Sequence, residues 1–306
     1  MRYLVTGVRG QLGYDVCKEL RNRGYNDIIE TNSSNMDITN YEEVDSVIDS
    51  TNPDVIIHCA AYTAVDKAEE DITGAFNVNV TGTENITLAA KRYNAKLIYV
   101  STDYVFDGTK DLNELYEITD AANPQSVYGI TKHKGELIAG SYDKSFIVRT
   151  SWVFGINGKN FVKTMLSLSE KYPELTVVCD QFGSPTYTKD LAKLLVDMSE
   201  TEKYGLYHAN NSGYCNWAEF ADYILKDTNT TVRHVSTEDY YAPQYAKAEK
   251  EGRELHIAYR PRNSKLSKKS LEQAGFELLP DWKDAVDRYI KELNLQKEDE
   301  MKLIMK

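Results

Sequence analysis

Cysteine is scarce in this sequence, and no hydrophobic run is long enough to cross a membrane. The four cysteines are far apart and form no CxxC pair; they are Cys17, Cys59, Cys179 and Cys215. This pattern favours reduced, buried thiols over disulfides. Every apolar run falls short of the roughly 18 residues that a spanning helix needs, and no signal peptide precedes the first apolar run. We therefore expect a cytoplasmic protein with no membrane partner.

Positive charge is scarce as well. The 306 residues include 36 Lys and Arg against 47 Asp and Glu, which gives a formal net charge of -11. Binding to nucleic-acid phosphates requires a basic patch, so we expect no nucleic-acid partner. An anionic ligand would have to be held by local groups. With 42% hydrophobic residues, the chain can build a sizeable core, as one large domain or two intimate ones.

Short apolar runs alternate with amphipathic stretches in the first half of the chain. The predicted strands are Tyr3–Thr6, Asp27–Glu30, Val55–Cys59, Leu97–Ser101 and Phe146–Arg149. The predicted helices lie near Leu12–Arg23, Tyr41–Ser50, Ile72–Tyr93 and Ser126–Gly140. This alternation is typical of right-handed βαβ units. It predicts an α/β fold, a Rossmann-type doubly wound parallel sheet with a smaller C-terminal substrate-binding lobe.

The alternation loosens after about residue 150. We expect residues 1–150 to form a dinucleotide-binding Rossmann domain whose sheet is completed by about residues 174–210. In that stretch Leu175–Asp180 and Gly205–Ala209 are predicted to be further strands. Residues 151–173 and 211–306 are richer in Trp, Tyr, Pro and charge, and they are expected to form the substrate-binding lobe.

A glycine-rich turn, Gly7-Val-Arg-Gly10-Gln-Leu-Gly13, follows the first predicted strand and opens a helix. Glycines at such a turn let the backbone approach a pyrophosphate, which the helix N-terminus also attracts. Glu30 ends the second predicted strand, where an acid can bond the adenosine ribose and favour NADH. Arg9 lies inside the turn and could instead meet a 2′-phosphate. The residues alone leave the phosphate state of the cofactor open.

A tyrosine and a lysine four residues apart, Tyr128 and Lys132, lie on one face of a predicted helix. An ammonium held beside a phenol lowers its pKa, which suits Tyr128 to general acid–base chemistry on a carbonyl or alcohol. The same spacing at Tyr14 and Lys18 lies far from any expected substrate and is interpreted as structural. Thr102 ends the fourth predicted strand, where ligands of open α/β sheets bind. Neighbouring Ser101 should face the other way.

Several longer stretches resemble one enzyme family. They are Gly7–Gly13, Cys59–Glu69, Ser101–Gly108, Tyr128–Lys132, Arg149–Gly155, Asp180–Thr186 and Arg260–Ser264. Over nearly the whole chain they resemble the dTDP-4-dehydrorhamnose reductases, which belong to the extended short-chain dehydrogenase/reductase superfamily. The resemblance implies NAD(P)H-dependent reduction of the C4 keto group of dTDP-4-dehydro-L-rhamnose to dTDP-L-rhamnose, the last step of dTDP-rhamnose synthesis. It implies NADPH as cofactor, with NADH as the alternative.

The resemblance also implies roles for individual residues. Tyr128 would donate the proton to the C4 oxygen, Lys132 would bond the nicotinamide ribose, and Thr102 would hydrogen-bond the carbonyl. Asp103 and Trp152 would contact the sugar nucleotide, a dTDP-4-dehydro-6-deoxy sugar. The cofactor would be lined by Gly7, Gly10, Gln11, Leu12, Gly13, Glu30, Asp37, Ile38, Ala61, Tyr62, Thr63 and Lys132.

Some members of the family bind Mg²⁺ through carboxylates at a dimer interface. The matching positions are Asp15, Asp190 and Glu292, and oxygen ligands of this kind suit Mg²⁺. The resemblance therefore implies a metal site here and is compatible with a homodimer.

Two other functions fit parts of the pattern. A nucleotide-sugar epimerase or dehydratase of the same superfamily would regenerate its cofactor. The dehydratases usually carry an acid pair after the Thr, whereas Thr102-Asp103-Tyr104 offers one acid. A non-catalytic regulatory subunit, like that of methionine adenosyltransferase, is disfavoured because both Tyr128 and Lys132 are present.

Overall fold

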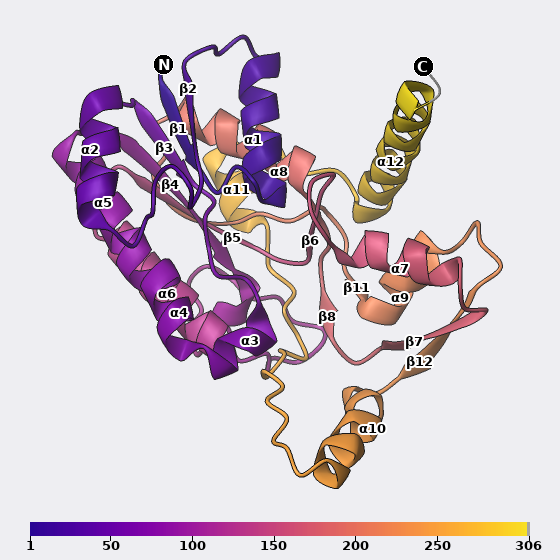
Figure 1. The fold of residues 1–306 in the computed structure, drawn as a ribbon. Coiled ribbons are helices and arrows are strands. Elements are labelled where there is room, and N and C mark those ends of the chain that lie inside the picture. Colours follow the sequence, from indigo (N-terminus) through magenta and orange to yellow (C-terminus); the bar gives the residue numbers. More distant parts are fainter. Residues whose placement is uncertain (305–306) are drawn as a thin grey trace.

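Six parallel strands form the central sheet, as predicted (Figure 1). The computed structural model describes the backbone of residues 1–304 and the side chains of residues 1–296. In spatial order the strands are β2 (Ile28–Thr31), β1 (Tyr3–Thr6), β3 (Val55–His58), β4 (Lys96–Thr102), β5 (Ser145–Thr150) and β10 (Gly205–His208). The strand order reverses between β1 and β3, so the carboxyl ends of these two strands flank the crevice where open α/β sheets bind ligands.

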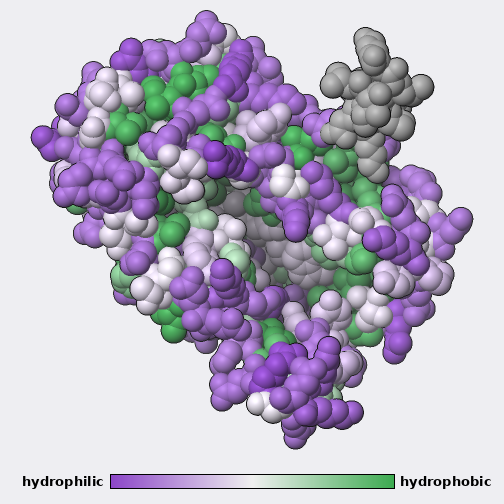
Figure 2. Space-filling view, viewed as in Figure 1, coloured by the Kyte–Doolittle hydropathy of each residue, from purple (hydrophilic) through white to green (hydrophobic). Residues whose placement is uncertain are grey.

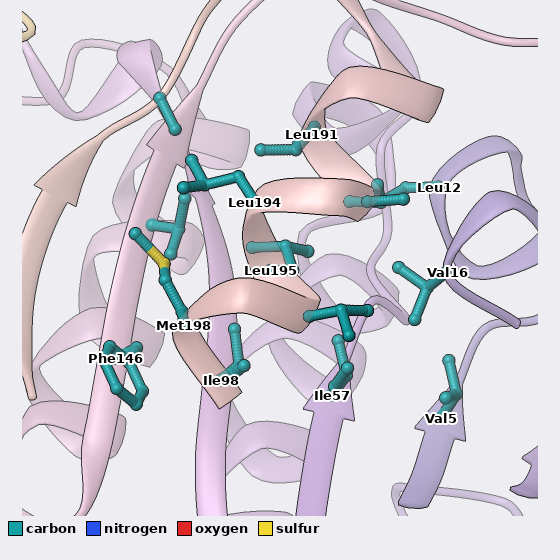
Figure 3. Close-up of a cluster of buried hydrophobic side chains, with 14 of the residues drawn as sticks. Val5, Leu12, Val16, Ile57, Ile98, Phe146, Leu191, Leu194, Leu195 and Met198 are labelled. Carbon is teal, nitrogen blue, oxygen red and sulfur yellow. The ribbon is translucent and has the colours of Figure 1, made fainter. Parts of the chain in front are cut away.

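Helices cover both faces of the sheet, which is why its inner strands are apolar on both sides. One face carries α2 (Tyr41–Thr51), α5 (Gly82–Arg92) and α6 (Val127–Gly140), packed on Leu4, Ile56, Leu97 and Ile147. The other face carries α1 (Gln11–Asn22), α8 (Thr188–Ser199) and α11 (Lys269–Ala274). There Val5, Ile57, Ile98 and Phe146 meet the leucines of α8 (Figure 3). The doubly wound α/β fold is confirmed.

The predicted helix near Ile72–Tyr93 is interrupted. After the short α3 (Val65–Glu70), the chain forms α4 (Ile72–Phe76), a π-helical segment (Asn77–Thr81) and α5. Such π-helical turns often occur at functional sites. Here the segment turns Asn79 toward the loop after β3, where its side chain accepts a hydrogen bond from Tyr62 N (2.8 Å) and donates one to Tyr62 O (3.1 Å).

The prediction that residues 174–210 complete the sheet is half wrong. β10 joins the sheet beside β5, but β7 (Glu174–Val178) does not. β7 instead pairs in parallel with β12 (Thr231–Val235), and this pair lies apart from the main sheet. The burial of β7 alternates along its length, with Leu175 and Val177 inward and neighbours exposed, which fits a strand packed on one face only.

A second hydrophobic cluster lies beside the sheet domain. It includes Phe154, Val162, Leu175, Phe220 and Tyr289. Its elements are β6 (Val153–Phe154), α7 (Phe161–Ser169), β7, β8 (Phe182–Gly183), β9 (Thr186–Tyr187), β11 (Cys215–Asn216), α9 (Trp217–Ile224), β12 and α12 (Trp282–Ile304). α10 (Thr237–Lys250) projects below it (Figure 1). Residues 305 and 306 of the predicted lobe lie outside the described part. None of the described helices is long and apolar enough to span a membrane.

A buried ion pair joins α6 to β5. Arg149 donates from Nε and Nη2, along one edge of its guanidinium, to the two oxygens of Glu136, with N–O distances of 2.8 Å, and both side chains are 5% exposed. Burial by itself raises the pKa of Glu136, but hydrogen bonds from Arg149 and His133 outweigh it and lower the pKa to about 2. A charged pair in such a dry place holds two elements in one register as long as both partners are present.

Replacing Glu136 by Gln should lower the free energy of unfolding by about 3 to 5 kcal/mol, because Arg149 stays buried without its counter-charge. Urea unfolding measures the change. The folded-state pKa of about 2 lies below the ordinary 4.5, so the wild type should lose this stability as the pH falls from 4.5 toward 2. The variant should lack that dependence.

The matched control is Glu277→Gln, which breaks an exposed pair with Lys193 and should leave the unfolding free energy nearly unchanged. Equal stabilities of Glu136→Gln and the wild type would contradict the role given to the buried pair.

Candidate active site

A cavity of about 740 Å³ opens at the carboxyl ends of the parallel strands. The surface is hollowed here, between the sheet domain and the second cluster (Figure 2). Most of the predicted site residues line it: Gly7, Gly10, Gln11, Leu12, Gly13, Asp37, Ile38, Ala61, Thr63, Thr102, Asp103, Tyr128, Lys132 and Trp152. Segments separated by more than a hundred residues therefore meet in one place.

The glycine-rich turn closes tightly at one end of the cavity. Gly7 has a positive φ of 69°, and a Cβ there would lie 2.8 Å from the backbone of Ala60. A Cβ on Gly13 would lie 2.5 Å from the carbonyl oxygen of Gly7. Bare backbone in this cradle leaves the N-terminus of α1 open to a pyrophosphate. The turn thus fits a dinucleotide.

The side chain of Gln11 ties this turn to the other side of the cavity. Its amide oxygen accepts hydrogen bonds from Gly155 N (2.8 Å) and from the side chain of Asn160 (3.0 Å). Asn157 donates to the carbonyl of Arg9 at 2.8 Å. The cavity therefore has walls from both parts of the chain.

Glu30, predicted to bond the adenosine ribose, is not among the residues that line the cavity. Its carboxylate pairs with Arg21 of α1, and both side chains are exposed. Asn32 and Ser33, just beyond β2, line the cavity instead. Arg9 also lines it and donates to the hydroxyl of Ser34 at 3.0 Å. This corner therefore contains the donors Arg9, Asn32 and Ser33 beside the carboxylate of Asp37.

Tyr62 is the other predicted cofactor residue outside the lining. Its neighbours Ala61 and Thr63 border the cavity, but the phenol of Tyr62 turns away and donates to Asp71 at 3.2 Å. Its backbone is held by Asn79 of the π-helical segment, which fixes the loop between those two neighbours.

Tyr128 and Lys132 both reach the cavity from α6, which Ser126 caps by accepting from Gly129 N at 3.1 Å. Lys132 Nζ donates to the carbonyl of Val100 at 2.7 Å. Burial lowers the pKa of Lys132 to about 7, although nearby Glu136 raises it.

The expected lowering of the Tyr128 pKa is not found. Burial raises the pKa of Tyr128 to about 12, although a hydrogen bond with Thr102 lowers it in part. Lys132 does not offset this effect of burial, because its Nζ donates to the carbonyl of Val100 rather than to the phenol. Tyr128 therefore keeps its proton at neutral pH.

Thr102 and Asp103 form a polar pair at the end of β4. Thr102 Oγ1 donates to Asp103 at 3.0 Å, and the second carboxylate oxygen of Asp103 is buried with no hydrogen-bond partner among the described residues. Burial raises the pKa of Asp103 to about 6, although the hydrogen bond from Thr102 lowers it in part. Ser101 lies beside Glu136 instead. As predicted, only Thr102 faces Tyr128.

Trp152 closes the cavity from the side of the second cluster. Its backbone adopts φ 47°, a conformation that is uncommon outside glycine. The indole stacks on Trp217 with ring centres 3.8 Å apart, and Gly183 leaves room beneath it. Strain of this kind persists where the surroundings fix it and is frequent at functional sites.

The three predicted metal ligands do not fit a divalent cation. Asp190 accepts from both terminal nitrogens of Arg288, at 2.7 and 2.8 Å. Asp15 accepts from Thr188, and Glu292 accepts from Tyr187 and Lys18. In the described part of the chain, no three His, Cys, Asp or Glu side chains form a group that could hold a metal. Lys18 also takes no part in the cavity, and neither does Tyr14.

Sequence reasoning missed several lining residues. The clearest are Asn32, Ser33, Cys59, Lys159 and Trp217. Asn32 and Ser33 follow β2 directly, so their place after a predicted strand was a usable signal. Trp217 begins α9, far along the chain, and no local pattern connects it with Trp152.

The family model of the RmlD substrate binding domain matches residues 1–295. The chain belongs to this family. A dTDP-4-dehydrorhamnose reductase from Aggregatibacter actinomycetemcomitans is 41% identical over 301 residues, which cover 93% of this chain and 97% of that protein. The spore coat polysaccharide biosynthesis protein SpsK of Bacillus subtilis is 37% identical, with 95% and 97% covered.

Solved structures agree with this membership in the RmlD family. A dTDP-4-dehydrorhamnose reductase from Bacillus anthracis in complex with NADP has a TM-score of 0.87 and 38% identity, covering 95% of this chain and 99% of that one. A UDP-glucose 4-epimerase from Thermus thermophilus, 17% identical with a TM-score of 0.77, shares the fold.

Replacing Gly13 by Ala should weaken binding of the reduced nicotinamide cofactor by about tenfold or more, because the new Cβ would displace the Gly7 carbonyl. Fluorescence titration with NADPH measures this. Gly140→Ala is the control, since a Cβ there meets nothing within 4 Å. Unchanged affinity in Gly13→Ala would show that the turn does not cradle the cofactor.

Removing divalent cations should leave the protein unchanged, because Asp15, Asp190 and Glu292 already have internal partners. We expect the same melting temperature after dialysis against a chelator and after addition of Mg²⁺. A rise in melting temperature with Mg²⁺ that Asp190→Asn abolishes would restore the metal site.

Proposed function

We propose that this chain reduces the C4 carbonyl of dTDP-4-dehydro-L-rhamnose with NADPH and so forms dTDP-L-rhamnose. The observation that carries the proposal is the meeting of Tyr128 and Thr102 in the same cavity as the glycine-rich turn. The two relatives named dTDP-4-dehydrorhamnose reductase support the substrate. No feature of the cavity favours a second function.

Two parts of the cavity suit the cofactor, one its pyrophosphate and the other its nicotinamide ribose. The bare backbone at Gly7 and Gly13 leaves room for a pyrophosphate, and Lys132 is within the same cavity for the nicotinamide ribose. NADPH is favoured over NADH because Glu30 is occupied by Arg21, while Arg9 is placed to meet a 2′-phosphate. The NADP complex of the relative from Bacillus anthracis agrees with this choice. When bound, the cofactor supplies the hydride to C4.

Tyr128 supplies the proton. Its pKa of about 12 keeps the phenol protonated at neutral pH, so it can donate as negative charge develops on the C4 oxygen. Thr102 lies beside it, and a hydroxyl there adds a second donor to the same oxygen. A carbonyl oxygen placed between the two side chains would receive both hydrogen bonds.

Asp103 and Trp152 orient the sugar. The buried oxygen of Asp103 without a partner lies in the lining of the cavity, where a sugar hydroxyl can donate to it. Trp152 lines the same cavity and offers apolar surface to the sugar. Trp152 belongs to the predicted substrate-binding lobe, residues 151–173 and 211–306, whereas Asp103 follows β4 of the sheet domain. A homodimer and a cytoplasmic location stay predictions from the sequence.

Tyr128→Phe should lower kcat by about 10²- to 10⁴-fold, since the proton donor is lost, while the affinity for NADPH is kept. The assay follows loss of reduced-nicotinamide absorbance with dTDP-4-dehydro-L-rhamnose made in situ, with NADPH and NADH compared. Tyr14→Phe, in the second Tyr–Lys spacing, is the control and should retain full activity.

Two results would overturn the proposal. A near-normal kcat in Tyr128→Phe would show that Tyr128 is not the proton donor. If the wild type oxidises neither NADPH nor NADH, the protein is not a reductase of this substrate. The remaining alternative would be an epimerase, which consumes no net cofactor.

A further inference from the structure

A loop of the second cluster lies directly on the glycine-rich turn. This clasp loop, residues 155–160, joins β6 to α7. Within it the side chain of Asn157 donates to the carbonyl oxygens of Arg9, at 2.8 Å, and of Gly10, at 3.3 Å. Carbonyl oxygens repel a phosphate. Asn157 therefore occupies two carbonyls of the turn that would oppose an anion, while the N–H groups at the start of α1 stay free for one.

The next residues of the clasp loop contact the first residue of α1. Asn160 donates to the side-chain oxygen of Gln11 at 3.0 Å. A Cβ on Gly158 would lie 3.6 Å from the side chain of Gln11. The residues before and after Lys159 are therefore held against the turn, which places Lys159 beside the N-terminus of α1.

Lys159 brings a positive charge to this place. It lines the cavity together with the glycine-rich turn. No acid within residues 1–296 forms an ion pair with it. Lys163, one helical turn later, is engaged inside the loop, because its ammonium donates to the carbonyls of Ile156 (2.6 Å) and Gly158 (3.0 Å). Of these two lysines, Lys159 is the one that can reach a ligand in the cavity.

The ligand expected at this end of the cavity is an anion. α1 has no acidic residue in its first turn, and Gly10 provides no side-chain cap, so the first N–H groups of the helix favour a phosphate. A dinucleotide places its pyrophosphate at such a helix start. The protein carries a net charge of -11, so its overall field repels an anion, and a cation beside the turn has to offset that repulsion.

The 2′-phosphate of NADPH belongs to another corner of the cavity. There Arg9 donates to Ser34 at 3.0 Å, just beyond β2. The clasp loop donates its hydrogen bonds to residues 9–11 of the turn. Its lysine therefore lies on the side of the pyrophosphate.

We propose that Lys159 binds the pyrophosphate of the nicotinamide cofactor. The cofactor is then held by the glycine-rich turn on one side and by the clasp loop of the second cluster on the other. A lysine ammonium is a compact point charge on a flexible stem, which suits a phosphate whose other oxygens are fixed by backbone N–H groups. The proposal rests on the proposed function for the presence of the cofactor.

Binding of the cofactor alone, without the sugar nucleotide, tests this assignment. In fluorescence titrations Lys159→Gln should weaken the binding of NADPH and of NADH by about tenfold each, because both carry the pyrophosphate and the variant loses a charge-assisted hydrogen bond. Arg9→Gln should weaken the binding of NADPH alone, since NADH has no 2′-phosphate. Lys159→Arg keeps the charge and should bind both cofactors within about threefold of the wild type.

Lys171→Gln is the matched control. This exposed lysine follows α7 and does not line the cavity, so its loss should leave both affinities unchanged. The melting temperature of Lys159→Gln without cofactor should equal that of the wild type, which separates a binding role from a role in folding.

Three results would overturn the proposal. Unchanged affinity of Lys159→Gln for both cofactors would show that the ammonium does not contact the pyrophosphate. A loss confined to NADPH would move Lys159 to the 2′-phosphate. Weaker binding of dTDP with cofactor binding kept would assign Lys159 to the sugar nucleotide. If the wild type binds both cofactors through Lys159 but reduces no dTDP-4-dehydro-L-rhamnose, the proposed reaction fails while the assignment of Lys159 stands.

Discussion

The ion pair between Glu136 and Arg149 is the contact on which the active site depends. Tyr128, Lys132 and Glu136 follow one another at four-residue spacing, so they share one face of α6. Glu136 is bound by two hydrogen bonds to β5, next to the strand that ends in Thr102. The pair therefore sets both the rotation and the height of α6 on the sheet. A helix held only by apolar contacts could slide, and the phenol would then miss Thr102.

The sequence predicts most of the sheet domain because its signals are local. Strand β1 matches its prediction at both ends, and the glycine-rich turn and the Tyr128–Lys132 pair lie where strand–helix order places them. The wrong predictions concern strand or ion-pair partners that lie far away in the sequence and that a local pattern cannot identify. Leu175–Asp180 has the composition of a strand, but whether it joins the main sheet depends on β12, more than fifty residues later. Glu30 has the right position in the sequence for a ribose ligand, but its carboxylate pairs with Arg21 of α1.

Local sequence patterns are also insufficient to predict the pKa values and ion pairs of the site. The spacing of Tyr128 and Lys132 suggests a lowered phenol pKa, but the balance depends on how dry the site is and on where the ammonium points. Lys132 donates its hydrogen bond to the carbonyl of Val100, and burial raises the pKa of Tyr128. The metal ligands fail for a related reason, since Arg288 and Lys18 come from distant parts of the chain to neutralise Asp190 and Glu292. Ion pairs form between residues that are close in the folded chain, so spacing along the sequence can only suggest candidate ligands.

The stacked indoles of Trp152 and Trp217 give the molecule an optical probe of its own. Two rings with centres 3.8 Å apart and planes 15° apart couple their electronic transitions, so circular dichroism should contain a paired positive and negative band from them. Both rings line the cavity, and Trp152 is held in a left-handed backbone conformation. A ligand that reaches Trp152 will change this signal, and one confined to the glycine-rich turn will not. The two halves of the cavity can thus be observed separately without a label.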